Sequence, residues 1–296
     1  MWISRRHLWA TCASPCGHLP RDGHTQARRR TGCATGPIGH GAAGDVKIPC
    51  MRRLHPGPAA DVTIGELYDV PRPRAPDGRP RIGICMVSSL DGSIVFGGGS
   101  AGLSSANDIE VLLTLRRLAD VIMVGAGTVR AEGYGAPRKA GQRIGVVTTS
   151  GDVDATSPLF TSGAGFLICT DETPDRGVEA LRVGSGRIDL AQAVDRLAEL
   201  VPDVGFVQAE GGSHLNGALL GAGLVDELHL TLSPQMVGGT GPRLADGPDV
   251  ATAFDLAHLA VDEGSFVFSR WVRRGITETT SGATSGASTG GASAGG

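Results

Sequence analysis

The stretch GFVQAEGGSHLNGALLGAGLVDELHLTL, residues 205–232, does most to decide the fold of this chain. It begins with a short apolar strand, 205–208, which runs into the turn Glu210-Gly211-Gly212. Residues 213–222 have the apolar spacing of a helix, and the segment ELHLTL (227–232) alternates as a strand does. A strand, a glycine turn, a helix and a second strand in succession are typical of an α/β protein.

The same alternation continues on both sides of this stretch. The sequence predicts helices over 105–119 and 190–200, and strands over 81–88, 121–124, 143–148, 166–169, 255–261 and 266–272. Because apolar strands alternate with helices, we expect a central sheet that helices cover on both faces. The last two strands are joined by the turn Glu263-Gly264 and should be antiparallel. The predicted fold class is therefore α/β, with a mixed and mostly parallel sheet.

The two ends of the chain differ from this middle part. Residues 1–55 show neither helical nor strand periodicity, and their cysteines and histidines match no standard zinc site, so no metal is predicted. We interpret them as a disordered segment or a non-native extension before a natural start at Met51; an Arg-rich transit peptide is the alternative. The Gly/Ser/Thr/Ala composition of 276–296 predicts a flexible tail. The predicted folded domain is 56–275.

Composition and charge exclude several classes of protein. The chain has 296 residues and a net charge of −3, so it lacks the basic field that a nucleic-acid-binding protein uses. No stretch reaches the roughly 18 apolar residues of a membrane span, and no apolar core of a secretory signal is present. Cys85 and Cys169 fall inside predicted strands, where free thiols suit a reducing compartment. These features predict a cytoplasmic protein.

Three glycine-containing turns follow predicted strands. They are Ser88-Ser89-Leu90-Asp91-Gly92, Gly125-Ala126-Gly127-Thr128-Val129 and Glu210-Gly211-Gly212-Ser213. Ligands of open α/β sheets bind beyond the carboxyl ends of the strands, where glycine lets the backbone approach closely. Two of the turns lead into helices, whose free N–H groups suit a pyrophosphate. None is a GxGxxG or Walker motif, and one such turn alone could be structural; the three together predict a ligand site.

Several stretches in the same order resemble the reductase domain of bacterial riboflavin biosynthesis, the C-terminal half of a bifunctional deaminase–reductase. They are VSSLDG (87–92), LRRLADVIMVGAGTV (115–129), AEGY (131–134), AEGGSHLNGALLGAGLVDEL (209–228) and LSPQMVGG (232–239). The lead-in IGELYDVP (64–71) resembles that of free-standing actinobacterial members. The resemblance covers about 64–274 and implies a dihydrofolate reductase-like three-layer fold, an NADPH cofactor and a homodimer.

The resemblance also implies which residues hold the cofactor. The turns of the family that bind NADPH correspond here to Val124, Gly125, Gly127, Thr128, Gly211, Gly212, Ser213, His214 and Leu215. The turn Thr148-Thr149-Ser150 corresponds to the adenosine end, where Ser150 could bind the 2′-phosphate or could belong to a plain turn.

On the substrate side, Asp108 begins a predicted helix. It could accept hydrogen bonds from the N–H and amino group of a pyrimidine or pterin ring, or cap the helix. Ser89 borders the end of the first predicted strand. Arg138 could bind a phosphate or be an idle loop residue, and Glu210 could orient the substrate or close its loop. The proton donor is Asp91 or an ordered water, although an Asp-Gly turn can be purely structural.

The chain also departs from the bifunctional enzymes. It contains neither the H-x-E nor the P-C-x-x-C motif of their zinc deaminase, so we expect no deaminase activity. Cys85 stands where they commonly have Lys, and Gly102 where they have Trp; both differences lie on the substrate side.

Three functions therefore remain open. The first is an NADPH-dependent reductase of a ribosylaminopyrimidine phosphate in riboflavin biosynthesis, similar to 5-amino-6-(5-phosphoribosylamino)uracil reductase. The second is a dihydrofolate reductase-like pterin reductase. The third is a non-catalytic NADPH-binding protein.

Overall fold

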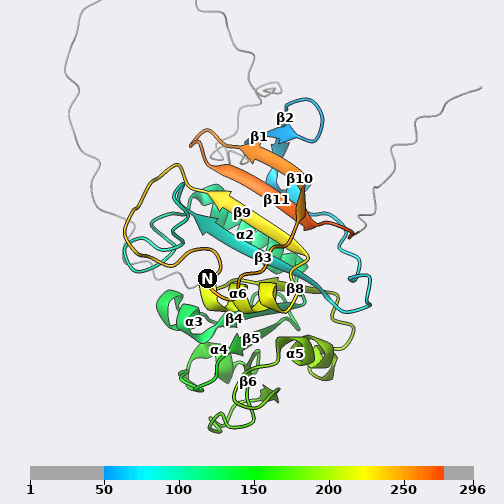
Figure 1. Ribbon diagram of the computed structural model, residues 1–296, viewed down its shortest axis with the longest axis vertical. Helices are drawn as coiled ribbons and strands as arrows, with labels where there is room; N and C mark the ends of the chain where they lie inside the picture. The colour runs from blue at the N-terminus through cyan, green and yellow to red at the C-terminus, as the bar shows by residue number, and fades with distance from the viewer. Residues whose placement is uncertain (1–49, 277–296) are drawn as a thin grey trace, which may run out of the picture.

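The structure, a computed structural model, describes residues 50–276, which form one continuous sheet with helices on both faces (Figure 1). The strands are β1 (Cys50–His55), β2 (Ala60–Thr63), β3 (Arg81–Ser88), β4 (Val121–Gly125), β5 (Arg143–Val147), β6 (Gly165–Cys169), β7 (Ala180–Arg182), β8 (Phe206–Ala209), β9 (Glu227–Leu232), β10 (Phe254–Val261) and β11 (Val267–Arg273). The helices are α1 (Ile64–Tyr68), α2 (Ala106–Leu118), α3 (Ala126–Glu132), α4 (Pro158–Thr161), α5 (Leu190–Arg196), the 3₁₀ turn η1 (Leu197–Glu199) and α6 (Ser213–Gly221).

The order of strands across the sheet is β2-β1-β10-β11-β9-β3-β8-β4-β5-β6-β7. All pairs from β9 to β7 are parallel, and all pairs from β2 to β9 are antiparallel. The prediction of a mixed, mostly parallel sheet is confirmed. The burial of the strands changes with their pairing. In the parallel part β4 and β6 are apolar and almost wholly buried, whereas β9 at the junction alternates between buried and half-buried residues.

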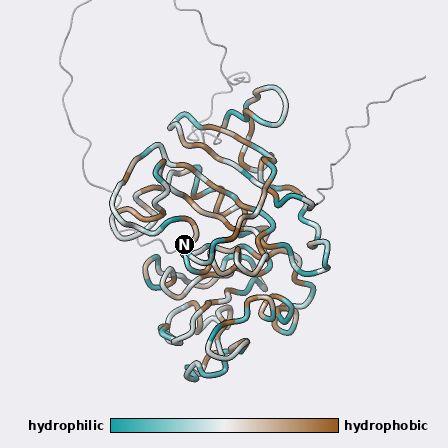
Figure 2. Tube along the Cα trace, in the orientation of Figure 1, coloured by the Kyte–Doolittle hydropathy of each residue, from teal (hydrophilic) through white to brown (hydrophobic). Residues whose placement is uncertain are grey.

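The two faces of the sheet carry separate apolar cores. On one face α5, η1 and α6 pack against the parallel strands through side chains such as Val194, Leu197 and Leu219. On the other face α1 and α2 cover β3, β10 and β11, while α3 and α4 cover β4, β5 and β6. Figure 2 shows the apolar residues concentrated along the strands and the polar residues in the outer loops. Helices on both faces were predicted, and the three-layer arrangement is confirmed.

The folded part begins earlier than predicted. Residues 50–55, which the sequence analysis assigned to the N-terminal extension, form β1 and pair with both β2 and β10. The side chain of Met51 is only 1% exposed. The strand was missed because two adjacent arginines and a following proline hide its alternation. The rest of the predicted extension, 1–49, and the predicted tail from 277 onward lie outside the described residues.

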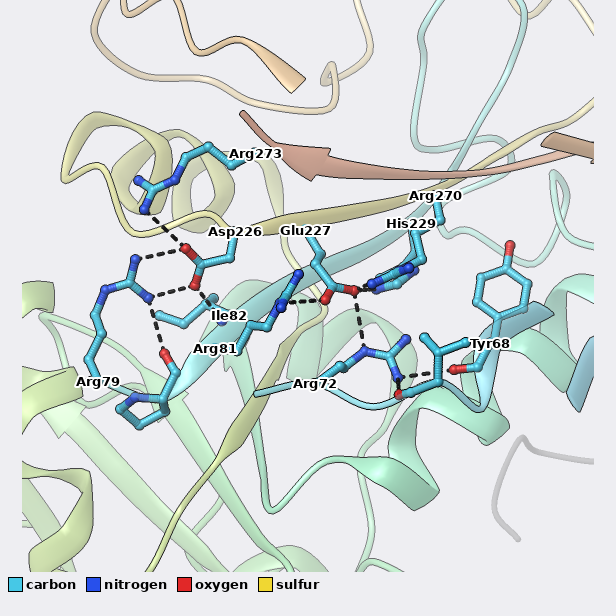
Figure 3. A network of polar contacts seen from close by, with 12 residues as sticks. Tyr68, Arg72, Arg79, Arg81, Ile82, Asp226, Glu227, His229, Arg270 and Arg273 are labelled. Atoms are coloured by element: carbon cyan, nitrogen blue, oxygen red, sulfur yellow. Dashed lines mark hydrogen bonds and ion pairs between the residues drawn. The ribbon is translucent and has the colours of Figure 1, made fainter. Parts of the chain in front are cut away.

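Two buried acids, Glu227 and Asp226, fasten residues 72–79 to the sheet. Glu227 on β9 lies 3.2 Å from Nε of Arg72, 2.6 Å from Nε of Arg81 and 2.9 Å from Nε of Arg270, and His229 lies 3.2 Å away (Figure 3). We call these five residues the Glu227 cluster. The adjacent Asp226 accepts two hydrogen bonds from Arg79 and one from the backbone N–H of Ile82. These contacts join β3, β9 and β11 to residues 72–79. No local sequence pattern predicted them.

No helix within residues 50–276 has both the length and the apolar character that crossing a membrane requires.

Candidate active site

A cleft of about 3030 Å³ opens toward the carboxyl ends of β3, β4 and β5. Its walls come from α2, α3 and the first turn of α6, and the loop 94–102 contributes a further part of the rim. A pocket for one small ligand usually measures about 300–1000 Å³, so this cleft has room for a dinucleotide and a second molecule.

Two of the predicted glycine turns meet in this cleft. The backbone N–H of Gly125 donates to the carbonyl oxygen of Gly211 over 2.7 Å, which joins the end of β4 to the end of β8. Gly211 has φ +76, and a Cβ there would lie 3.0 Å from Sδ of Met86. A Cβ on Gly212 would lie 3.2 Å from Oγ1 of Thr128. The positive φ of Gly211 and the narrow space between Gly212 and Thr128 therefore favour glycine in this turn.

Most of the predicted cofactor residues line the cleft: Gly125, Gly127, Thr128, Ser150, Gly212, Ser213, His214 and Leu215. Val124 and Gly211 do not. Val124 is fully buried within β4, and Gly211 lies behind the cleft wall against Met86. Helix α6 begins at Ser213, and its N-cap residue Gly212 makes no side-chain capping bond. The first N–H groups of α6 are thus left for a ligand.

Glu210 is held by two side chains that the sequence analysis did not select. Nε and Nη2 of Arg116 donate to its two carboxylate oxygens over 2.7 and 2.6 Å, and the Tyr134 hydroxyl donates over 2.6 Å. The Arg116 guanidinium lies 5.2 Å from the centre of the Tyr134 ring. Of the two roles considered for Glu210, this geometry favours closing the loop, because both oxygens are already engaged.

Asp108 differs from Glu210 because it has no cation partner in the part of the chain that the structure describes. Its carboxylate lines the cleft, and the residue is 8% exposed. The Ser104 hydroxyl donates to Oδ2 over 2.5 Å. Burial raises the pKa of Asp108 above its usual value, although hydrogen bonds from Ser104 and Thr231 oppose the shift. Ser105, not Asp108, caps the helix, since its hydroxyl accepts the Asp108 N–H.

Cys85 lies on β3 in the floor of the cleft. Burial raises the pKa of its thiol well above the usual value, and the nearby charges of Asp108 and Glu210 raise it further. The thiol is therefore neutral at physiological pH and places no charge beside Asp108.

The structure does not bring Ser89 and Asp91 into the cleft. The Ser89 hydroxyl donates to Asp91 over 2.6 Å, and the Asp91 carboxylate accepts the backbone N–H groups of Val237 and Gly238. These hydrogen bonds, led by that of Ser89, hold the pKa of Asp91 well below its usual value. Asp91 therefore fastens one loop to another, and of the two roles considered for it this geometry favours the structural turn over proton donation.

Arg138 is exposed and lines the cleft, as a phosphate-binding residue would. Among the described residues it has no ion pair, whereas Arg116, Arg117, Arg130 and Lys139 in the same lining each face a carboxylate. Arg187 lines the cleft and is likewise without an ion pair in residues 50–276. Arg116 was not among the site residues predicted from the sequence, although its spacing of eight residues from Asp108 places both on one face of α2. Within the described range, no group of His, Cys, Asp and Glu side chains could hold a metal ion.

The chain is similar to a known protein family and to several of its members. Residues 80–268 match the model of the RibD C-terminal domain. The chain is 29% identical over 200 residues to the 2,5-diamino-6-ribosylamino-4(3H)-pyrimidinone 5′-phosphate reductase of Methanothermobacter thermautotrophicus, covering 61% of this chain and 90% of the relative. It is 26% identical over 199 residues to the riboflavin biosynthesis protein RibD of Bacillus amyloliquefaciens, covering 62% of this chain and 53% of the relative.

Solved structures show the same fold. A pyrimidine reductase-like protein from Corynebacterium diphtheriae has a TM-score of 0.59 at 22% identity, covering 72% of this chain and 95% of that protein. The riboflavin biosynthesis reductase of Saccharomyces cerevisia has a TM-score of 0.52 at 20% identity, covering 66% of this chain and 90% of that protein. The fold that the sequence resemblance implied is confirmed.

Proposed function

The chain belongs to the RibD C-terminal domain family, and from this membership we propose that it is an NADPH-dependent reductase of a ribosylaminopyrimidine 5′-phosphate in riboflavin biosynthesis. The observation that carries the proposal is the presence, in one cleft, of a glycine-lined phosphate cradle and a buried carboxylate without a cation partner among the described residues.

The residues of the cleft fit the proposed cofactor. The backbone at Gly125, Gly127 and Gly212 leaves room for a pyrophosphate, and the first N–H groups of α6 would hold it. The hydroxyl of Ser150 lines the same cleft and would bind the 2′-phosphate. Cys85 and Cys169 are free and buried, as suits an enzyme of the cytoplasm.

The substrate would place its pyrimidine ring against Asp108 and its phosphate near Arg138. A ribosylamine opens reversibly to an imine, and the C1′=N bond is the group that a hydride reduces, because the pyrimidine ring is aromatic. C1′ gains a hydride, which is the chemistry that NADPH supplies when bound, and the nitrogen gains a proton from water. The protein contributes the relative position of the two reactants.

We propose that the enzyme is a homodimer. Leu230, Leu232, Val267 and Trp271 lie on the antiparallel part of the sheet, are half-buried and belong to none of the apolar cores. A second copy of the chain would cover this face. Light scattering on the full chain should give twice the monomer mass, and Leu232→Arg should give the monomer; a monomeric wild-type protein would contradict the proposal.

The function is tested with the purified full chain, by calorimetry for NADPH binding and by NADPH oxidation with ribosylaminopyrimidine phosphates. Gly211→Ala should raise the Kd for NADPH by at least about tenfold, because a Cβ 3.0 Å from Sδ of Met86 would displace the turn that positions Gly212 and the first N–H groups of α6. Gly223→Ala is the matched control, since Gly223 also has positive φ but no atom within 4 Å of its Cβ. Absence of NADPH binding would reject the proposal, and binding without oxidation would favour a non-catalytic nucleotide-binding protein.

A further inference from the structure

Asp108 is a buried acid of the cleft whose charge nothing in the described part of the chain neutralises. The only other buried acid in the lining, within residues 50–276, is Glu210, which Arg116 neutralises. Hydroxyl groups of Ser104 and Thr231 and the neutral thiol of Cys85 surround Asp108. A buried charge without a counter-ion is costly, so the site is expected to receive hydrogen-bond donors from a ligand.

Resting on the proposed function, we propose that Asp108 selects a pyrimidine with an amino group at C2 over its deaminated uracil counterpart. In the 2-amino-4-oxo ring, the N3–H and the 2-amino group are adjacent donors, and a carboxylate accepts both. In the uracil, the N3–H lies between two carbonyl oxygens, so one acceptor would face the carboxylate. A carbonyl oxygen buried against the carboxylate oxygen leaves two acceptors facing each other without a donor, which weakens binding.

The uracil has one other edge with paired donors, formed by N1–H and the ribosylamino N–H. That edge is lost in the reducible form of the substrate, because the imine nitrogen carries no hydrogen. The 2-amino ring keeps its N3–H and amino donors in the imine. The carboxylate therefore distinguishes the two substrates in the form that accepts the hydride, and the chain is expected to act before deamination of the ring.

The test compares kcat/KM of the full chain for 2,5-diamino-6-ribosylamino-4(3H)-pyrimidinone 5′-phosphate and for its deaminated counterpart. The wild-type protein should prefer the diamino substrate by at least about 100-fold. In Asp108→Asn the amide presents one acceptor and one donor, which match the N3–H and C2 carbonyl of the uracil, so the preference should reverse. Asp255→Asn is the control, because Asp255 is exposed and pairs with Arg274 outside the cleft.

Calorimetric titration of both pyrimidines provides a readout that does not depend on turnover, and should show the same order of affinities. Equal use of both substrates by the wild-type protein, or a preference for the uracil, would overturn the inference and leave the reductase proposal intact. An unchanged preference in folded Asp108→Asn would also overturn it. If neither substrate supports the oxidation of NADPH, the proposed function would be rejected instead. The wild-type comparison decides the substrate form even where the variant fails to fold.

Discussion

Glu227 and Asp108 are both buried carboxylates, but their surroundings differ. Glu227 is fully buried among three arginines and His229 at the start of β9 (Figure 3). Asp108 is 8% exposed at the start of α2 and receives hydrogen bonds only from hydroxyl groups. Burial would raise the pKa of Glu227 too, but His229, Arg72 and Arg270 hold it well below its usual value. Burial alone thus does not identify a functional acid. Glu227 and Asp108 differ because, among the residues that the structure describes, only Glu227 has cationic side chains around it.

The two carboxylates differ in whether cationic side chains of the protein balance their charge. The Glu227 cluster contains its own counter-charges, so it stabilises the native fold and needs no ligand. Asp108 keeps a charge that the described part of the chain does not balance, and it borders a cleft. Unbalanced charge in a cleft is a property of binding sites, whereas balanced charge in a core is a property of the fold.

The largest effect is expected from Glu227→Gln. This variant keeps the shape of the side chain but leaves Arg72, Arg81 and Arg270 around an uncharged amide. Removing one partner of a buried ionic cluster costs about 3–5 kcal/mol, which is a large share of the stability of a typical domain. Chemical denaturation followed by circular dichroism measures the loss.

The matched control is Glu199→Gln, in which the exposed ion pair with Arg196 is removed. Its denaturation midpoint should not change measurably, because exposed pairs contribute little. Equal midpoints for Glu227→Gln and the wild-type protein would show that the Glu227 cluster does not stabilise the fold.

A smaller loss of stability is expected when the pH is lowered. Burial lowers the pKa of His229 to about 4, and the charges of Arg72 and Arg270 act in the same direction, while Glu227 opposes them. The unfolded chain therefore binds a proton that the folded chain does not, between pH 6.5 and about 4. Stability should fall as the pH drops through this window, by roughly 3 kcal/mol from His229 alone.

Denaturation midpoints measured at a series of pH values test this. His229→Gln should be less stable at neutral pH and should lose less stability on acidification than the wild-type protein. The same pH slope in both proteins would exclude His229 as its source.

The comparison also explains what the sequence could predict. Strand 81–88 was predicted with its observed bounds, and the helix predicted over 105–119 is observed as Ala106–Leu118, because both have strong local periodicity. The glycine turns were recognisable because each follows an apolar strand. The Glu227 cluster was not, since Arg72 and Glu227 are 155 residues apart and the segment ELHLTL reads as ordinary alternation. The pairing of Arg116 with Glu210 spans 94 residues and was missed for the same reason.

The smallest effect on stability, with the opposite sign, is expected from Asp108→Asn. Because burial raises the pKa of Asp108, the ionised side chain opposes folding at neutral pH. Replacing it by a neutral amide should stabilise the protein by up to about 1 kcal/mol, while activity toward the diamino substrate falls. As the pH drops toward 3.8 the wild-type carboxyl takes up a proton in the folded state first, so its disadvantage should disappear. Paired denaturation curves at neutral and acidic pH measure this convergence. A variant that is less stable than the wild-type protein at neutral pH would mean that Asp108, like Glu227, serves the fold.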